Sequence, residues 1–423
     1  MTDNNQPKTY DLKGRVITVK VGELQSYVPS ADYTTRVGEV TYKLMKEAEE
    51  KFNCKFEFEV IPKWATVNND FLTYTLAGLV YADVVRLQRS VIFPSYEKQN
   101  VLLPLNDYID FNQPVYKKFD QINGILYPEN IYGFFNGTPL TPIGIFYNRE
   151  VLYRDGIPDL HEYAANGIWN WNTFLDICIK TTHDYNGDGI IDQWGIGSPN
   201  AQYTSICMLR SNLQPIIAWA GGSNYVYNLQ NHKALKVLQF ITEMYNTYNV
   251  VNKNGEADFL KGKVAMFFRE AWYGEMLINN GMRNLGFEEL PVGPDNPGRA
   301  FMREQGSNFF FFPSTLKDPE GVVNAVAHWN VIWDDTKSEY VTLEDMVLSQ
   351  AQVYFDSETE INRFMEMMNY KVEYDYIDYF SPSKTRITSR VFDEIAKDQI
   401  STASAVESVK NEVEAIINDK MSK

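Results

Sequence analysis

The sequence predicts an α/β fold, and three observations lead to this prediction. Short runs rich in β-branched and aromatic residues at 15–21, 55–60 and 82–87 have the length and composition of strands. The segments at 37–52 and 69–79 place apolar residues at helical spacing. Strands that alternate with amphipathic helices are typical of a mainly parallel sheet covered by helices. The length of 423 residues predicts two or three domains.

The first half of the chain supports this pattern element by element. The helix at 37–52 has one apolar face, made by Val37, Val40, Leu44, Ala48 and Phe52. The next strand alternates apolar and charged residues until Pro62 ends it, with Phe56, Phe58 and Val60 on the apolar side. Residues 133–142 are rich in Gly and Pro, which indicates a crossing between domains before a strand at 143–148.

The second half continues with the same two kinds of element. Asn170 is placed to cap a helix at 171–181, and Gly221 and Gly222 interrupt the apolar stretch that begins at Met208. Apolar spacing then predicts a helix that contains Leu235 and Leu238. Strands are expected at 264–268 and 309–313, and helices around 325–329 and through an acidic tail at 338–423.

The composition excludes several classes of function. A net charge of −16 and a pI near 4.8 disfavour a nucleic-acid partner. The three cysteines have no spacing typical of a disulfide framework or a zinc site. No run approaches the roughly 18 apolar residues of a membrane span. The first residues lack the apolar stretch of a signal peptide, so we expect either a cytoplasmic protein or the mature form of an exported one. Aromatic residues make up 14% of the chain, and Tyr and Trp beyond the needs of the core can form platforms for sugar rings or peptides.

An oxygen-rich loop at 184–195 predicts a site for a hard cation. Side-chain oxygens recur along it, and Gly189 supplies a sharp turn. The helix-loop-helix calcium pattern requires a bidentate Glu at its twelfth position, where this chain has Gly195, so any Ca²⁺ would be structural. Gln193, or a residue distant in sequence, would complete the shell. The alternative is an Asn/Asp/Gly turn without a metal. The predicted ligands are Asp184, Asn186, Asp188, the carbonyl of Ile190, Asp192 and Gln193.

Polar residues follow the strand at 82–87. In open α/β sheets, ligands bind beyond the carboxyl ends of the strands. Gln88, Arg89 and Ser90 are therefore candidate site residues. The alternative for Arg89 is an ordinary surface charge.

Several stretches, taken together and in this order, resemble one family: 10–15, 76–85, 102–109, 147–150, 169–174, 184–195 and 259–266. The chain resembles the extracellular solute-binding proteins of ABC importers, the group that includes maltose-binding protein and other oligosaccharide binders. The similarity spans nearly the whole chain. No single stretch is specific, but their shared order is.

The resemblance implies a two-lobed periplasmic-binding-protein-like fold of class II type with a ligand cleft that closes by hinge motion. The expected lobes are 1–137 with 287–312, and 138–286 with 313–423, the helical tail packing on the second. The resemblance also implies an ABC transporter permease as partner and a monomer. It implies a place outside the cell, lipid-anchored in Gram-positive bacteria or periplasmic, with the signal segment removed.

The resemblance also assigns site residues by position. Trp272 lies six residues after Met266 and matches the aromatic residue that commonly stacks on a sugar face, with Tyr273 beside it. The chain departs from the family after strand one, where a tryptophan is common and residues 23–27 stand instead. Cleft-facing loops and the Gly221-Gly222 turn contribute the remaining candidates: Gln25, Tyr27, Trp64, Arg89, Ser90, Arg210 and Trp219.

These residues favour binding without chemistry. Trp272 and Trp64 can bury the apolar face of a sugar while polar side chains pair with its hydroxyls, which favours an oligosaccharide ligand. An acidic saccharide is the alternative if Arg89, Arg210 and Arg269 converge. A glycoside-processing enzyme with two carboxylates is the rival class, although no HExxH or GxSxG motif occurs. A structural cell-surface module is the third.

Overall fold

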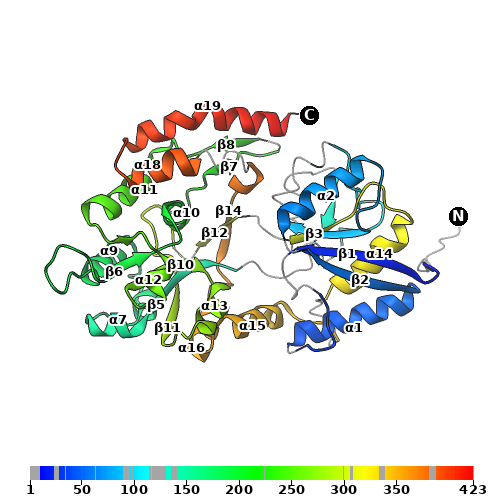
Figure 1. Cartoon of the computed structure of the whole chain (residues 1–423), viewed down its shortest axis with the longest axis horizontal. Coiled ribbons are helices and arrows are strands. Elements are labelled where there is room, and N and C mark those ends of the chain that lie inside the picture. The colour runs from blue at the N-terminus through cyan, green and yellow to red at the C-terminus, as the bar shows by residue number, and fades with distance from the viewer. Residues whose placement is uncertain are drawn as a thin grey trace. The chain divides into compact units, whose positions relative to one another are not determined.

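The computed structural model divides the chain into two compact units (Figure 1). The first contains 1–139 and 306–349, and the second contains 140–305 and 350–422, so the chain crosses between them three times. The structure describes residues 10–22, 28–33, 35–61, 63–88, 96, 99–113, 116, 130–134, 141–222, 224–298, 300–304, 308–332, 339–380 and 387–422.

The first unit is built on a five-stranded sheet with the order β2-β1-β3-β13-β4. Strand β1 (Arg15–Gly22) pairs in parallel with β2 (Cys54–Ile61) on one side and with β3 (Val84–Gln88) on the other. Strands β13 (Asn308–Phe311) and β4 (Gly133–Phe134) complete the sheet in antiparallel pairings. The sheet is therefore parallel where the sequence alternates strands and helices.

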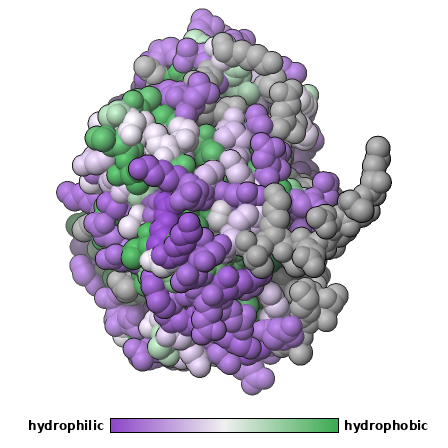
Figure 2. Space-filling view, turned by 90° about the vertical axis from the view of Figure 1, so that its right-hand side faces the viewer, coloured by the Kyte–Doolittle hydropathy of each residue, from purple (hydrophilic) through white to green (hydrophobic). Residues whose placement is uncertain are grey.

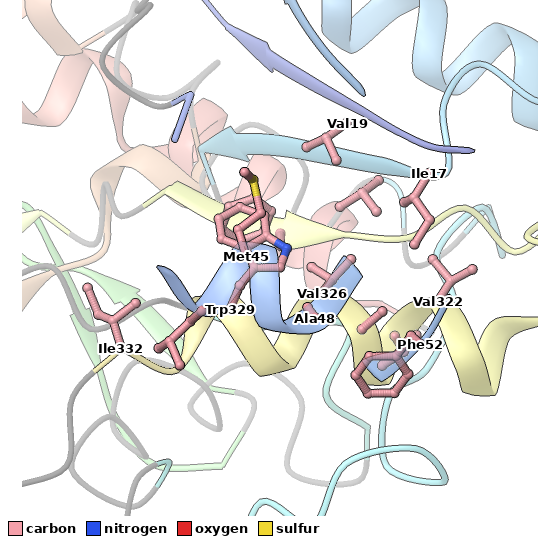
Figure 3. Close-up of a cluster of buried hydrophobic side chains, with 14 of the residues drawn as sticks. Ile17, Val19, Met45, Ala48, Phe52, Val322, Val326, Trp329 and Ile332 are labelled. Carbon is pink, nitrogen blue, oxygen red and sulfur yellow. The ribbon is translucent and has the colours of Figure 1, made fainter. Parts of the chain in front are cut away.

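Helices α1 (Arg36–Lys51) and α14 (Pro319–Asn330) bury their apolar faces in a cluster of hydrophobic side chains in the first unit (Figure 3). Ile17 and Val19 of β1 meet Ala48 of α1 and Val326 of α14, and none of these side chains is more than 1% exposed. Helix α2 (Trp64–Leu76) lies on the side of β1 away from α1 (Figure 1). The predicted helix at 37–52 is confirmed, with Thr35 capping its first turn by accepting from the Gly38 N–H.

The second unit has its own five-stranded sheet, ordered β11-β5-β10-β6-β9. Strand β10 (Val264–Glu270) lies at its centre, antiparallel to β5 (Ile143–Asn148) and parallel to β6 (Trp194–Gly197). Strands β11 (Leu285–Glu289) and β9 (Val251–Asn252) form its edges.

Helices surround this sheet, and their bounds are α7 Arg149–Arg154, α8 Leu160–Ala165, α9 Trp171–Lys180, α10 Ala201–Ser211, α11 His232–Thr242, α12 Glu256–Phe259, α13 Tyr273–Asn279, α16 Glu358–Met367, α18 Asp393–Ala396 and α19 Thr402–Met421. Short π-helical or 3₁₀ turns occupy Glu243–Thr247, Ile377–Phe380 and Thr388–Phe392. The boundary between the units falls inside α15 (Leu343–Tyr354).

Two small sheets complete the second unit. Strand β12 (Ala300–Glu304) pairs in parallel with β14 (Lys371–Asp375), and β7 (Ile217–Trp219) forms a hairpin with β8 (Tyr225–Tyr227). Helix α19 runs along this hairpin (Figure 1). The Tyr227 hydroxyl of β8 donates to the Val406 carbonyl of α19 at 3.3 Å.

The structure corrects the expected domain boundaries. Strand β11 begins before residue 287 and pairs with β5, so it belongs to the second unit and not to the first. Helix α14 belongs to the first unit because its apolar face packs on α1. The tail at 338–423 is divided in the same way, since 306–349 falls in the first unit and only 350–422 in the second.

Some expected elements also differ from the structure. The acidic tail contains strand β14, and the apolar stretch from Met208 divides into the end of α10 and strand β7. The α/β class and the strands at the predicted positions are confirmed. All three cysteines are buried, and none of them forms a disulfide within the described residues. No helix in the described part of the chain is both long enough and apolar enough to cross a membrane. The face in Figure 2 is mainly hydrophilic, with apolar residues interspersed.

Candidate ligand-binding site

Trp272 sits at the end of the central strand of the second unit. Strand β10 is buried from Val264 to Phe268, and the chain turns at Ala271, whose N–H donates to the Pro142 carbonyl at 3.0 Å. Trp272 is the residue before α13, and its ring is 44% exposed. A large aromatic side chain that is anchored at a sheet end yet open to solvent is suited to stacking on a ligand.

Tyr273 packs against the Trp272 ring. It is only 2% exposed, and its ring meets that of Trp272 edge to face at 5.6 Å and 74°. Behind it, Phe267 lies 6.3 Å away and stacks on Phe259 at 5.0 Å. Burial, with a further contribution from Glu256, raises the pKa of the Tyr273 hydroxyl. The structure therefore places Tyr273 in the packing under Trp272, and direct contact with a ligand stays a prediction.

Arg269, on the same strand, is surrounded by rings. Its guanidinium lies 4.3 Å from the Tyr273 centroid and 5.6 Å from the centroids of both Trp272 and Tyr203. Its Nη1 approaches a Glu270 carboxylate oxygen at 3.4 Å. The Arg269 guanidinium thus lies where the end of β10 meets the start of α13 and the start of α10.

Trp219 is carried by the β7–β8 hairpin and is 46% exposed. Its indole N–H donates to the Gly222 carbonyl at 2.8 Å, inside a turn where Gly221 and Gly222 have φ values of +100° and +57°. Positive φ favours glycine, so the turn depends on these two residues. Because the N–H is already paired, the exposed ring presents mainly an apolar face.

A buried carboxylate anchors that hairpin. Asp375, at the end of β14, is 1% exposed and accepts from the N–H groups of Ile216, Ile217 and Ile377 at 3.0 to 3.2 Å. The Tyr376 N–H donates to the Ile217 carbonyl at 3.1 Å. The hairpin that carries Trp219 is therefore fixed to the end of strand β14.

Arg210 lies inside the second unit, unlike the exposed position expected for a ligand contact. It is 4% exposed and lines a small enclosed space with Ser211, Glu289 and Met302. Arg210 and Glu289 line the same space, and buried charged residues are usually paired within the protein. Convergence of Arg89, Arg210 and Arg269 on an acidic ligand stays a prediction, since Arg89 lies outside the described residues.

The site residues predicted in the first unit follow strands that end together. Strands β1, β2 and β3 are parallel, and Val21 pairs with both Val60 and Arg86, so their carboxyl ends share one edge. Trp64 begins α2 and Gln88 ends β3. The side chains of Trp64 and Gln88 lie outside what the structure describes, and so do the residues Gln25, Tyr27, Arg89 and Ser90.

The oxygen-rich loop protrudes from the base formed by His183 and Gln193, which pair as an antiparallel bridge. Asp184 accepts from the N–H groups of Gly187 and Gly189 at 2.7 and 2.8 Å. Asp188 accepts from the Ile190 N–H, and Asp192 from the Tyr185 N–H. Hydrogen bonds from backbone N–H groups, Gly189 first, hold the pKa of Asp184 below its usual value.

The donor chemistry of this loop suits Ca²⁺, because it offers carboxylates, the Asn186 amide and the Ile190 carbonyl. Within the described ranges, no three His, Cys, Asp or Glu side chains converge to form a metal site by themselves. Gln193 lies at the base of the loop. It is 2% exposed, its amide N–H groups donate to Asp155 and to the Thr181 carbonyl, both at 2.8 Å, and its side-chain oxygen accepts from Arg154 and from the Tyr185 hydroxyl. Gln193 as a cation ligand stays a prediction.

Sequence reasoning missed Tyr203 and Asp375. The signal for Tyr203 was present, because Asn200 caps α10 by accepting from the Tyr203 N–H at 2.9 Å, and this cap places Tyr203 in the first turn. Asp375 had no signal, since the backbone groups that it binds include two from a strand more than 150 residues away.

A cavity of about 570 Å³ at the start of α9 contains none of the predicted site residues. Trp171, Phe240 and Asn172 line it, and the Trp171 ring stacks on Phe240 at 4.5 Å. Its size alone does not make it the site, because Trp171 is mostly buried and its indole N–H is bound to Ser211.

Solved structures share the fold over almost the whole chain. A cyclo/maltodextrin-binding protein complexed with maltotetraose is 14% identical, with a TM-score of 0.65 over 96% of this chain and 97% of that one. An ABC substrate-binding protein from Listeria monocytogenes in complex with cycloalternan is 15% identical, with a TM-score of 0.64 over 96% and 99%. The maltose/maltodextrin-binding domain from Bdellovibrio bacteriovorus bound to maltotriose is 14% identical, with a TM-score of 0.61 over 96% and 100%.

No curated protein matches the sequence significantly. The family model described as bacterial extracellular solute-binding protein matches residues 31–329. This match covers well over half of the chain and includes parts of both units. The chain therefore belongs to the bacterial extracellular solute-binding protein family.

Proposed function

We propose that the protein binds an oligosaccharide outside the cell and delivers it unaltered to the permease of an ABC importer. The exposed Trp272, held at the end of β10 by buried rings, is the observation that carries this proposal. Burying one face of a sugar ring on such a platform contributes roughly 1.5 to 3 kcal/mol. The saccharides bound by the structural neighbours support the same ligand class.

The proposal includes a monomer without enzymatic activity, anchored to the membrane by lipid or free in the periplasm. Two units that the chain joins by three crossings are suited to hinge closure around a ligand. In such a protein Trp272 and Trp219 stack on the saccharide, and polar side chains pair with its hydroxyls. Contributions from Trp64 and from the loops after β1 and β3 belong to the same proposal.

A bound Ca²⁺ in the loop at 184–192 is the second part of the proposal. Asp184, Asn186, Asp188 and Asp192 would hold it, with the Ile190 carbonyl. The recurrence of side-chain oxygens along the loop supports this part of the proposal. The ion would have a structural role in joining the ends of the loop.

A thermal-shift screen against neutral di- to hexasaccharides tests the proposed function. A ligand at 100 times its dissociation constant should stabilise the protein by about 2.7 kcal/mol, seen as a rise in Tm. W272A should lose most of this rise. Y248A removes an aromatic ring of similar exposure, 41%, outside the candidate site and should keep it. The absence of any shift across the panel would count against saccharide binding.

A further inference from the structure

The contacts of Arg269 show what holds Trp272 in place. The indole is 44% exposed and is not fixed by burial, so its orientation depends on neighbours. Its ring touches two of them, the buried Tyr273 edge to face and the Arg269 guanidinium at 5.6 Å from the ring centroid. Tyr273 is fixed in the core through Phe267. Among the ring and cation contacts of the described residues, Arg269 is therefore the one outside the core that can restrict rotation of the indole.

Arg269 is itself restrained. Its side chain is 19% exposed, and the planar guanidinium lies against Tyr203 and Tyr273 as well as Trp272. A guanidinium stacks on aromatic faces in a way that the ammonium of lysine does not reproduce. The contact with Trp272 therefore requires Arg at this position rather than any cation.

The charges around Arg269 disfavour the binding of an anionic ligand. Glu270 already approaches its Nη1 at 3.4 Å. The Glu256 carboxylate faces the Tyr273 hydroxyl, and Glu275 lies in the first turn of α13. The Glu270 carboxylate balances the charge of Arg269, and the whole chain carries a net charge of −16. A uronate or other acidic saccharide would meet repulsion here.

We propose that Arg269 is a positioning residue that orients the Trp272 ring, and that this group of charges makes the site select uncharged saccharide rings over acidic ones. The selectivity for uncharged saccharides rests on the proposed function. The positioning role concerns only the side chains of Arg269 and Trp272 and holds without any ligand.

Fluorine NMR on protein labelled with 5-fluorotryptophan tests the positioning role. The Trp272 signal is identified by its loss in W272F. In R269Q the signal should move and narrow because the ring gains rotational freedom, and R269K should give the same change. R283Q, which removes an exposed Arg that binds only the carbonyls of Ile278 and Met282, should leave the signal in place. An unchanged Trp272 signal in folded R269Q would overturn the positioning role.

Titration calorimetry with maltotetraose and tetragalacturonate tests the selectivity. We expect the wild-type protein to bind maltotetraose at least tenfold more tightly than tetragalacturonate. R269Q should weaken the binding of maltotetraose about tenfold. E270Q should reduce the difference in affinity between maltotetraose and tetragalacturonate. Tighter binding of tetragalacturonate would contradict the selectivity while leaving saccharide binding intact. Equal affinity for the two probes would also overturn the selectivity, and the fluorine signal decides the positioning role separately. Failure of the whole saccharide panel, and not of these two probes alone, would contradict the proposed function.

Discussion

At the scale of single residues, the partly buried His161 joins two parts of the second unit. His161 Nδ1 lies 2.8 Å from a Glu288 oxygen and Nε2 lies 3.0 Å from a Glu360 oxygen. Arg149 contacts Glu360 and Arg363 contacts Glu288, each at 2.5 Å. Burial alone would lower the pKa of His161, but the hydrogen bonds to Glu288 and Glu360 outweigh it and raise the pKa to about 9.

This network predicts a pH dependence of stability. The ordinary pKa of a histidine in an unfolded chain is about 6.5, so the folded protein holds the proton more tightly. The stabilisation is complete below pH 6.5 and is lost as the pH rises towards 9, with a magnitude of up to about 3 kcal/mol. Urea unfolding at pH 6, 7.5 and 9 measures it. H161Q should flatten this pH dependence, whereas H232Q, at an exposed helix start, should retain it. A wild-type protein as stable at pH 9 as at pH 6 would rule the effect out.

Residue by residue, the family resemblance assigned Trp272 by its spacing from Met266. The structure leaves Trp272 exposed at the end of strand β10, and its contact with a ligand stays a prediction. The burial of Arg210 was not predictable, because a helix sequence does not show that the distant strand β11 brings Glu289 to the same small space. The contact of Gln193 with Asp155 was not predictable either, because the two residues are 38 positions apart.

At the scale of elements, the hairpin with Trp219 depends on Asp375. Replacing this carboxylate by an amide in D375N turns one of its acceptors into a donor that faces backbone N–H groups. We expect a loss of roughly 2 to 3 kcal/mol in the free energy of unfolding. D398N is the control, because Asp398 is exposed with a φ of 53°, which Asn tolerates, and should cost less than about 0.5 kcal/mol. Equal stability of D375N and D398N in urea would show that the anchor is unimportant.

The oxygen-rich loop predicts an effect of metal removal. A chelator should lower the Tm of the calcium-loaded protein, and D184N or D188N should lose that response. D176N alters a surface carboxylate on neighbouring α9 that pairs only with Lys180 and should keep it. A Tm that does not depend on calcium or chelator would identify the loop as a turn closed by its own hydrogen bonds.

Elements were predictable when their apolar pattern was long. Helix α1 has a full amphipathic face, and its predicted span agrees with the structure. Strand β14 was expected to be helical because five residues in an acidic, helix-rich tail carry too short a pattern, and its pairing with β12 depends on a distant segment. The same limit applies to β7, which has only three residues.

At the scale of the whole molecule, the order of segments predicted two α/β units, but not where the chain divides. The last two boundaries lie at 305–306 and 349–350 because β11 pairs with β5 and α14 packs on α1. Both contacts join segments more than 100 residues apart. Local patterns do not contain that information.

Hinge closure predicts a change in dimensions on binding. Small-angle scattering with saturating saccharide should give a smaller radius of gyration than the free protein. W272A, at the same saccharide concentration, should keep the value of the free protein. An identical radius for free and fully loaded wild-type protein would contradict closure, while leaving binding itself unaffected.

The central claim is that the protein binds a saccharide and releases it unchanged. Titration calorimetry with the saccharide selected by the thermal-shift screen, followed by chromatography of the recovered sugar, tests this most directly. We predict one saccharide bound per chain, micromolar affinity near −8 kcal/mol, and complete recovery of the intact sugar. Shortened products in the recovered fraction, or no saturable heat, would contradict the claim.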